Sequence, residues 1–427
     1  MSNAYKSTEL GVIPIDWDIV RFDSIAELRH GHQYRNYDFT DEGIKILKIT
    51  QIKSDETIDL SSCSFISGNR LEEFQKVVIN KGDILIALTG ATIGKIARFK
   101  SEELVLQNYR VGNFFPLKED VLYKDYFFHF LRSNLFYHQI ISRQTQSAQQ
   151  NIGKEEINNM LIFFPSFKEQ KAIASILTSF DDKIELLQAQ NETLETIAQT
   201  IFKEWFGKYQ VGDELPEGWR VGKIGEVAIL KSGYAFKSND FIDESNYKAL
   251  KIKDLKGNGK VDISNISCID KEITVLKRVK YFKLSEGDLV LAMSGNTTGK
   301  IGVVPPHEKE IYLNQRVGKF FLDDKRMISY LYNFLMSNDY ENKILSMGYG
   351  SAQPNINPSQ IENIDIIYPV KDQLKEYLDI SNPIFSKVLR NYSQIQTLQA
   401  TRDTLLPKLM SGQLRVAEFQ EQLSEVM

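Results

Sequence analysis

Two short glycine-rich segments carry the residues that could do phosphate chemistry. GATIGK spans residues 90–95 and GNTTGK spans 295–300, so each segment places a lysine directly after a glycine. A phosphate-binding P-loop needs four residues between its glycines and a serine or threonine after the lysine, which holds magnesium. Here three residues separate the glycines, and Ile96 or Ile301 follows the lysine. This spacing excludes nucleotide hydrolysis.

Other catalytic and metal-binding patterns are missing as well. The five histidines form no His-Glu-x-x-His motif, and Cys63 and Cys268 give no pair at zinc spacing. No Gly-x-Ser-x-Gly elbow or glycine-rich dinucleotide motif occurs. No proline is followed by aspartate, as a Pro-Asp nuclease core would need, and Asn357-Pro358 lacks the aromatic residue that an amino-methyltransferase would use. We expect a binding protein without a catalytic centre, a metal or a cofactor.

The elements that position the glycine segments occur twice in the chain. GDILIALTGATIGKI at 82–96 aligns without gaps on GDLVLAMSGNTTGKI at 287–301, with 8 of 15 positions identical. LQNYRVG at 106–112 likewise pairs with YLNQRVG at 312–318, and SAQQNI at 147–152 pairs with SAQPNI at 351–356. The nearly constant separation predicts two copies of one domain, which we call the first and second heads.

Each head is expected to be of mixed α/β class. The apolar runs at 84–88 and 289–293 each follow Gly-Asp and precede a glycine-containing turn, which predicts a strand, a loop and a returning strand. Aromatic-rich segments at 123–140 and 329–345 have the pattern of amphipathic helices that pack on a sheet.

A long helix with a heptad seam is predicted after each head. The first seam contains Ile173, Leu177, Phe180, Ile184, Leu187, Asn191, Leu194, Ala198, Ile201 and Trp205. The second is less regular and contains Val388, Asn391, Ile395, Leu398, Leu405 and Leu409, with Arg402 interrupting it. We expect the helices to pair antiparallel, with Asn191 setting the register and the heads related by approximate two-fold symmetry. Because Pro383 lies in the second segment, its first residues are not expected to be helical.

Composition and charge narrow the class of protein. The chain has 427 residues, a net charge of -4 and no apolar run of 18 residues. Its first residues lack the pattern of a secretory signal, which predicts a cytoplasmic protein. An acidic balance argues against coating phosphates non-specifically, so any nucleic-acid contact must come from local patches. The lysine-rich stretches at 248–260 and 277–283 are most simply solvated faces.

The order of motifs resembles the specificity subunit of type I restriction-modification systems. The resemblance rests on EQKAIASILTSFDDKIELLQAQNETLETIAQTIFKEWF at 169–206, ELPEGW at 214–219 and LLPKLMSGQLRV at 405–416, and it extends over essentially the whole chain. It implies two target recognition domains, at 1–165 and 210–370, and two long spacer helices, at 166–209 and 371–427, the latter including the C-terminal tail.

The family resemblance also implies a function. Each head would read one half of a bipartite site on double-stranded DNA. The helices would fix the spacing and dock two methyltransferase subunits, to which the restriction and motor subunits attach. The subunit would have no catalytic centre of its own, in agreement with the missing motifs.

The duplication divides the candidate DNA contacts into two groups. Positions alike in both heads should contact phosphates or support the scaffold, whereas differing polar positions should read bases. The candidates are Thr89, Thr92, Lys95, Asn108, Tyr109, Arg110, Gln149, Gln150 and Asn151 in the first head, and Ser294, Asn296, Thr297, Lys300, Asn314, Gln315, Arg316, Gln353 and Asn355 in the second. Each set of candidates has a comparably good structural interpretation. The glycine segments could be tight turns, Arg110 and Arg316 could lock a sheet edge, and the amides of the third segment could cap a loop. Weaker candidates are Tyr34, Lys48, Thr50, Gln51, Phe236, Lys251, Lys253 and Asp254.

Two rival functions stay open at this point. One is a structural adaptor with duplicated protein-binding domains and no DNA contact. The other is an autonomous enzyme, which the missing motifs disfavour.

Overall fold

The computed structural model describes residues 5–53, 56–144, 151–257, 259–337, 340, 343–344, 347 and 355–417. The chain divides into two compact units, unit 1 being Met1–Asp182 with Leu398–Met427 and unit 2 being Lys183–Thr397. Each unit contains one head together with parts of the two long helices.

The first head is built on an antiparallel sheet with the order β10-β9-β12-β4. Its strands are β4 (Ala26–His30), β9 (Ile84–Ala87), β10 (Ile96–Arg98) and β12 (Val111–Pro116). One face packs on α2 (Lys124–Leu131) and α3 (Asn134–Gln144), whose aromatic side chains, among them Phe127, Phe130 and Phe136, are fully buried. The predicted strand, turn, returning strand and aromatic helices are therefore confirmed in this head.

The other face of that sheet packs on a second, mixed sheet with the order β5-β7-β6-β11-β8. Its strands are β5 (Phe39–Thr40), β6 (Ile44–Leu47), β7 (Ser64–Ile66), β8 (Val78–Ile79) and β11 (Val105–Gln107), with β6 and β11 parallel. Leu85 and Val111 from the first sheet and Leu47 and Val105 from the second share one core. β9 is covered on both faces, by the aromatic helices on one side and by the second sheet on the other. Its residues are therefore apolar without alternation, which explains the continuous apolar run at 84–88.

Smaller elements complete the first head. β1 (Tyr5–Thr8) pairs with β2 (Gly11–Pro14), and β3 (Asp18–Arg21) pairs with β13 (Leu161–Phe164). The short helices are α1 (Phe22–Ile25) and α4 (Lys154–Asn158), and the 3-10 helices are η1 (Asn36–Asp38), η2 (Ile49–Gln51), η3 (Gly68–Val77) and η4 (Gly90–Thr92).

The second head repeats this topology, as the sequence duplication predicts. Its first sheet has the order β15-β24-β21-β22, formed by β15 (Ala228–Ser232), β21 (Leu289–Ala292), β22 (Ile301–Val303) and β24 (Val317–Leu322). The second has the order β16-β20-β17-β23, formed by β16 (Phe241–Ile242), β17 (Tyr247–Leu250), β20 (Ser267–Ile269) and β23 (Glu310–Leu313). Here too one pair, β17 and β23, is parallel.

Smaller elements complete the second head. β14 (Arg220–Lys223) pairs with β25 (Asp365–Tyr368), and β18 (Leu255–Gly257) pairs with β19 (Lys260–Val261). The helices are α6 (Lys271–Thr274), α7 (Lys277–Lys280), α8 (Ile328–Leu335) and α10 (Pro358–Glu362), and the 3-10 helices are η5 (Ile224–Glu226), η6 (Ser238–Asp240), η7 (Ile252–Asp254), η8 (Gly295–Thr297) and η9 (Lys325–Met327). Much of the predicted helix at 329–345 beyond α8 lies outside the described residues.

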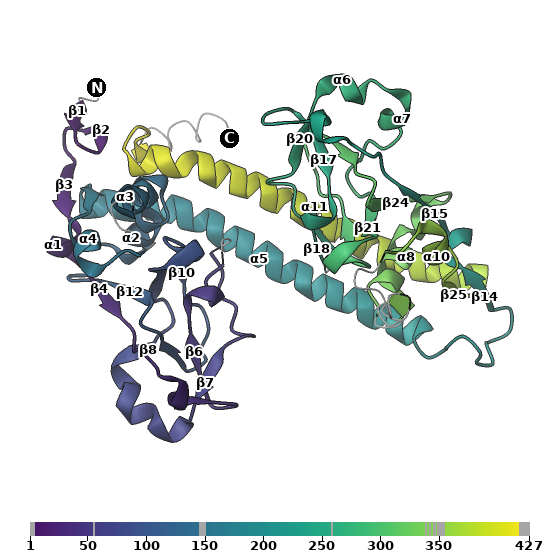
Figure 1. The fold of residues 1–427 in the computed structure, drawn as a ribbon, viewed down its shortest axis with the longest axis horizontal. Coiled ribbons are helices and arrows are strands. Elements are labelled where there is room, and N and C mark those ends of the chain that lie inside the picture. Colours follow the sequence, from purple (N-terminus) through teal and green to yellow (C-terminus); the bar gives the residue numbers. More distant parts are fainter. Residues whose placement is uncertain are drawn as a thin grey trace. The chain divides into compact units, whose positions relative to one another are not determined.

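Two 40-residue helices, α5 (Phe167–Phe206) and α11 (Lys371–Met410), follow the heads (Figure 1). In unit 1, Asp181 on α5 contacts Arg402 on α11 at 2.7 Å, while Glu169 near the start of α5 contacts Arg415, just beyond the end of α11, at 3.0 Å. In unit 2, Asn191 contacts Asn391, and the rings of Phe206 and Tyr377 lie 4.9 Å apart. The two helices are therefore in antiparallel contact within each unit, as predicted.

The heptad seams explain this pairing. Leu177 and Leu409 in unit 1 and Leu187, Val388 and Ile395 in unit 2 are buried, as the seam assignment requires.

None of the described helices is long and apolar enough to cross a membrane.

The expectation that Pro383 breaks the start of the second helix is wrong. α11 begins at Lys371 and continues through Pro383 without interruption. A proline inside a helix removes one main-chain hydrogen bond and costs about 3 kcal/mol. Buried contacts of Tyr377, Phe385 and Val388 on either side of Pro383 offset that cost.

Candidate nucleic-acid interface

The glycine segments form tight reversals between two strands of each head. In the first head Gly90 and Gly94 have φ values of +70° and +78°, a left-handed region that favours glycine. The amide of Gly94 donates to the carbonyl of Ala87 at 2.9 Å, and that of Lys95 donates to Thr92 at 3.1 Å. These two amides are used within the turn and are not available to a phosphate.

The second head repeats this reversal. Gly295 and Gly299 have φ values of +74° and +84°, and the amide of Gly299 donates to Ala292 at 2.8 Å. Lys300 is exposed, whereas its counterpart Lys95 is half-buried. Asn296 lies in η8, between the two glycines.

The hydroxyl groups beside the lysines face inward. Thr92 donates to the Thr89 carbonyl and Thr297 donates to the Ile252 carbonyl, each at 3.4 Å. The hydroxyl oxygens of Thr89 and Ser294, at equivalent positions, are buried and have no hydrogen-bond partner among the described residues. The hydroxyl groups of this set are thus less accessible than the lysines.

The Asn-x-Arg segments form a second turn in each head. Asn108 accepts a hydrogen bond from the Arg110 amide at 3.2 Å through its side chain, and Asn314 accepts one from the Arg316 amide at 3.4 Å. The asparagines therefore hold the turn, and both arginine side chains are exposed.

The residue between asparagine and arginine differs between the heads. In the first head, the Arg110 Nε donates to the Tyr109 hydroxyl at 2.6 Å, and its guanidinium lies 5.3 Å from the centre of that ring. In the second head Gln315 takes the place of the tyrosine and is exposed. The two turns thus present different polar groups on the same backbone.

A third segment lies beside both turns. Asn151 bridges Thr89 and Asn355 bridges Ser294 in antiparallel pairs, and both asparagines are exposed. The predicted candidates Gln149, Gln150 and Gln353 lie outside the described residues.

One residue in each head joins the three segments. The Leu88 amide donates to the Arg110 carbonyl, and the Leu88 carbonyl accepts from the Ile152 amide, both at 3.0 Å. Met293 makes the same two bonds with Arg316 and Ile356, at 3.0 and 2.9 Å. The structure therefore brings the glycine turn, the arginine turn and the asparagine segment together in each head. We call this set of segments the reading edge.

Sequence reasoning missed a glycine that supports the reading edge. A Cβ atom at Gly31 would lie 2.2 Å from the Gln107 carbonyl, and one at Gly233 would lie 2.2 Å from the Leu313 carbonyl. These close backbone crossings set the approach to Asn108 and Asn314, because the next residue, His32 or Tyr234, bridges that asparagine. The signal was present, since Gly31 and Gly233 align in the repeat.

Several of the weaker candidates make contacts inside the fold, whereas Thr50 and Lys253 are exposed. Gln51 and Asp254 are buried, and their side chains accept hydrogen bonds from the amides of Lys48 and Lys251 at 2.9 and 2.8 Å. The Lys251 ammonium lies 3.6 Å from the centre of the Phe241 ring, and burial lowers the pKa of this lysine.

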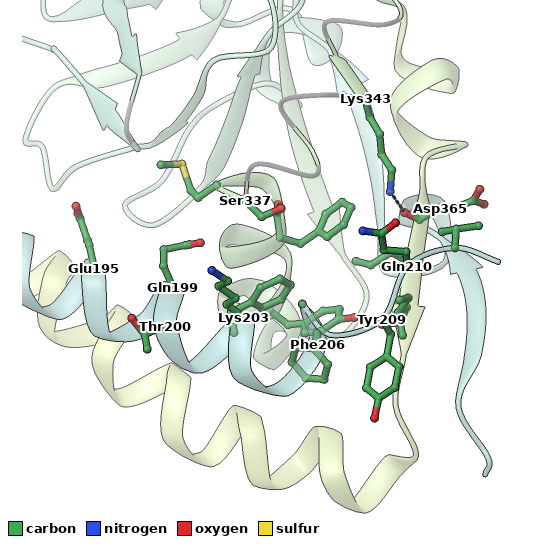
Figure 2. Close-up of a pocket in the computed structure, with 18 of the residues that line it drawn as sticks. Glu195, Gln199, Thr200, Lys203, Phe206, Tyr209, Gln210, Ser337, Lys343 and Asp365 are labelled. Carbon is green, nitrogen blue, oxygen red and sulfur yellow. Dashed lines mark hydrogen bonds between the residues drawn. The ribbon is translucent and has the colours of Figure 1, made fainter. Parts of the chain in front are cut away.

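A cavity of about 700 Å³ in unit 2 is separate from the reading edge. It lies between the end of α5, the segment after it, α8 and β25, and apolar side chains such as Phe206 and Phe334 line much of it (Figure 2). None of its described lining residues belongs to the three converging segments. The described residues contain no group of three or more His, Cys, Asp or Glu side chains that could hold a metal ion.

Comparison with known proteins gives consistent matches along the chain. The family model described as type I restriction modification DNA specificity domain matches residues 14–196 and again 216–396. The MjaIX specificity subunit of Methanocaldococcus jannaschii is 27% identical over 97% of both chains. The HindI specificity subunit of Haemophilus influenzae is 23% identical and covers 79% of this chain and 88% of its own. The crystal structure of a type I restriction-modification S subunit from M. genitalium has the same fold, with a TM-score of 0.57 at 18% identity over 92% of this chain and 96% of that one.

Proposed function

Because the chain belongs to the family of type I restriction modification DNA specificity domains, we propose that each head reads one half of a bipartite DNA target. The chain is a specificity subunit, the non-catalytic component of such a system. In the proposal, the paired helices hold the two heads at a fixed separation, which sets the number of base pairs between the half-sites.

The observation that supports this proposal is that the two reading edges share the same main-chain hydrogen bonds but carry different side chains. Both edges use the same main-chain bonds around Leu88 and Met293. Both expose an arginine and an asparagine, but Tyr109 of one head is replaced by Gln315 in the other. Groups common to both heads suit the uniform phosphate backbone, whereas differing groups suit base edges, which carry the sequence information.

The role of each candidate follows from its exposure. Lys300, Arg110 and Arg316 present cationic groups that suit phosphate oxygens, with Lys95 less exposed. Asn151 and Asn355 present amides that can pair with the donor and acceptor of adenine in the major groove. Tyr109 and Gln315 are the positions at which the two half-sites would first be told apart.

The proposed partners are double-stranded DNA, two methyltransferase subunits docked on the helices, and restriction and motor subunits attached through the methyltransferase. The proposal places the assembly in the cytoplasm and requires no cofactor bound to this chain.

A direct test is methylation sequencing of DNA from cells that express this chain with its methyltransferase. The expected product is methylation at a motif made of two specific tracts separated by a spacer of constant length. Methylation at a continuous, undivided motif overturns the proposal.

Binding measurements separate DNA reading from a purely structural adaptor. Phosphate contacts release counterions, so the affinity of the assembled complex for its motif should fall steeply and linearly with the logarithm of salt concentration. An affinity for DNA that is negligible at low salt would favour the adaptor.

A further inference from the structure

Each head carries a small hairpin that reaches toward the long helices. In the first head Ile52 bridges Ile58, and the Lys53 amide donates to the Thr57 carbonyl at 2.9 Å. In the second head the equivalent hairpin is formed by β18 and β19, in which Leu255 pairs with Val261. An offset of 203 residues superposes Ile52 on Leu255 and Ile58 on Val261. We call these two segments, 52–58 and 255–261, the tip hairpins.

One position of the tip hairpin has left-handed backbone in both heads. Glu56 has a φ of +66°, and Gly259, which is 203 residues later, has a φ of +71°. Glycine adopts this conformation freely, whereas a residue with a side chain rarely does. Glu56 is the one residue other than glycine with positive φ in the described part of the chain. Such outliers persist where the surroundings hold them, and they concentrate at functional sites.

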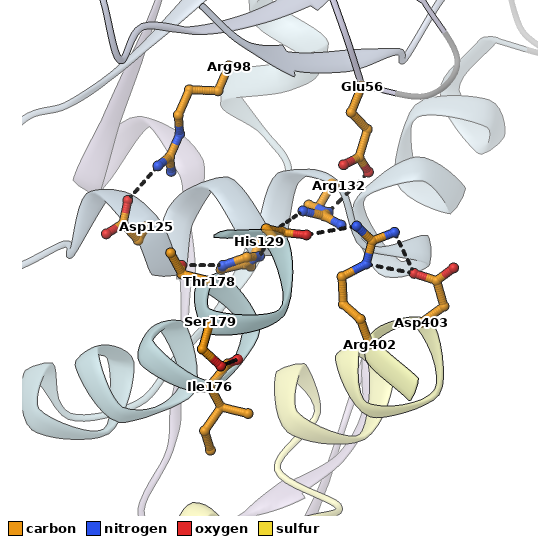
Figure 3. A network of polar contacts seen from close by, with 11 residues as sticks. Glu56, Arg98, Asp125, His129, Arg132, Ile176, Thr178, Ser179, Arg402 and Asp403 are labelled. Atoms are coloured by element: carbon orange, nitrogen blue, oxygen red, sulfur yellow. Dashed lines mark hydrogen bonds and ion pairs between the residues drawn. The ribbon is translucent and has the colours of Figure 1, made fainter. Parts of the chain in front are cut away.

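The surroundings that hold Glu56 are a network of charges on the helices. The Glu56 carboxylate lies 3.1 Å from Nε of Arg132, which follows α2. Nη1 of Arg132 lies 2.6 Å from Asp181 on α5, and Asp181 lies 2.7 Å from Arg402 on α11 (Figure 3). The Arg132 side chain is only 4% exposed. The tip of the first head is thereby joined to both long helices.

This network is not simply a source of stability. Burial raises the pKa of Glu56, and the positive charges of Arg132 and Arg402 oppose that rise only in part. Relative to the unfolded chain, the folded state therefore makes ionisation of Glu56 less favourable, because burial removes water from the carboxylate. Glu56 thus has both a strained backbone and an unfavourably buried charge. Its contact with Arg132 is better explained by a role in orienting the head than by a contribution to stability.

The second head docks its tip by different means. A Cβ atom at Gly259 would lie 2.2 Å from the Tyr332 hydroxyl, so the backbone itself packs on α8. Glu195 lies on α5, and burial raises its pKa. Glu195 also accepts a hydrogen bond from Tyr392 on α11 at 3.0 Å, and it lies at the rim of the cavity in Figure 2.

Arg132, Asp181 and Arg402, which form this network with Glu56, have no charged counterparts in unit 2. An offset of 204 residues superposes α2 on α8 and α5 on α11. At this offset Arg132 corresponds to Met336, Asp181 to Phe385, and Arg402 to Ala198 on α5. The first tip places a carboxylate on Arg132, whereas the second tip packs its backbone at Gly259 on Tyr332. Each tip thus fits only its own stretch of helix.

We propose that the tip hairpins are positioning elements that fix the angle of each head on the helix pair, the first through Glu56 and the second through Gly259. This rests on the proposed function, because the angle matters only if two heads read one duplex. One extra base pair moves a half-site by about 3.4 Å and about a tenth of a turn. A head held at its tip cannot follow that displacement, whereas a released head can.

The test for the first head is Glu56→Gly, which removes the carboxylate and relaxes the backbone. The duplexes carry the motif that methylation sequencing finds for the wild-type complex, with the native spacer or one base pair more. In the variant, the affinity for the native spacer divided by the affinity for the longer spacer should fall about tenfold, which corresponds to about 1.4 kcal/mol. Glu56→Gln, which keeps an acceptor for Arg132, should retain most of the ratio. Glu119→Gln, an exposed carboxylate of the same head, is the charge control and should leave it unchanged.

The test for the second head is Gly259→Ala, whose Cβ atom would collide with the Tyr332 hydroxyl. This variant should lower the same ratio about tenfold, and adding Tyr332→Phe, which removes the hydroxyl, should restore most of it. An unchanged ratio in Gly259→Ala overturns the positioning role of the second tip.

Hydrogen exchange separates this inference from the function on which it rests. In Glu56→Gly the amides of Lys53 and Asp59, which close the first tip hairpin by donating to Thr57 and Gln51, should exchange faster without any DNA present. Unchanged exchange refutes the tip contact. Faster exchange with an unchanged spacer ratio refutes the positioning role alone. An undivided wild-type motif refutes the proposed function instead.

Discussion

Arg110 and Arg316 are the residues at which the two reading edges are most alike. Both are exposed on turns held by an asparagine side chain. Because the phosphate backbone is the same at both half-sites, we expect each arginine to contact a phosphate.

Replacing either arginine should therefore weaken binding without changing the motif. Arg110→Ala and Arg316→Ala are each expected to reduce by about one the slope of log affinity against log salt. Arg21→Ala and Arg326→Ala, in which exposed arginines paired with Asp23 and Asp324 are removed, serve as matched controls. Loss of discrimination at a single base pair would show that the arginine reads a base instead.

Asp181 illustrates how a single carboxylate joins elements of one unit. Burial alone would raise its pKa, but Arg132 and Arg402 outweigh burial and hold the pKa of Asp181 below its ordinary value of 3.8. A lowered pKa in the folded state means that this carboxylate contributes stability above the unfolded pKa, which is lost as the pH falls through the folded one.

Asp181→Asn should destabilise the protein by about 3 kcal/mol at pH 7, because it leaves two arginines with a reduced counter-charge. The difference from wild type, measured by urea unfolding, should shrink as the pH falls below 3.8. Asp182→Asn, at the exposed neighbouring position, should change little at either pH. An equal loss at pH 7 and at pH 3 would contradict the assigned ionisation.

At the scale of elements, the paired asparagines decide how α5 and α11 meet. Asn391 Nδ2 donates to Asn191 Oδ1 at 2.8 Å, and Asn191 Nδ2 donates to the Val388 carbonyl at 3.3 Å, with both residues buried in the seam. A polar pair in an apolar seam can form this hydrogen bond in one register only, which is the role that the sequence predicts for Asn191.

A double-mutant cycle tests this pair. Asn191→Leu or Asn391→Leu alone should lower the free energy of unfolding by about 1–3 kcal/mol, because the remaining amide stays buried without its partner. The double replacement by leucine should recover most of that loss. Strictly additive losses would mean that the two asparagines do not act together.

At the scale of the whole molecule, the duplication predicts that the two heads read their half-sites independently. Each head has its own two sheets, its own reading edge and its own tip hairpin. Exchanging residues 1–165 for the first head of another specificity subunit should change only one half of the methylated motif. Methylation sequencing would contradict this independence if both halves changed.

The sequence by itself determined the repeated architecture. Two aligned copies of a strand, a glycine turn and a returning strand can only fold alike, because apolar periodicity and turn residues act locally. The heptad spacing likewise determined that the two long helices need apolar partners. The missing catalytic motifs and the order of segments pointed to a specificity subunit, which family membership shows.

The tertiary structure decided what local pattern leaves open. Three features depend on contacts between residues far apart in the chain. Leu88 joins three segments, Gln51 is buried, and Glu56 pairs with Arg132. The same holds for Pro383, whose local preference against helix is outweighed by packing along α11. Local propensities amount to about 1 kcal/mol at most positions, so burial of a few large side chains reverses them, and only the folded chain shows where that happens.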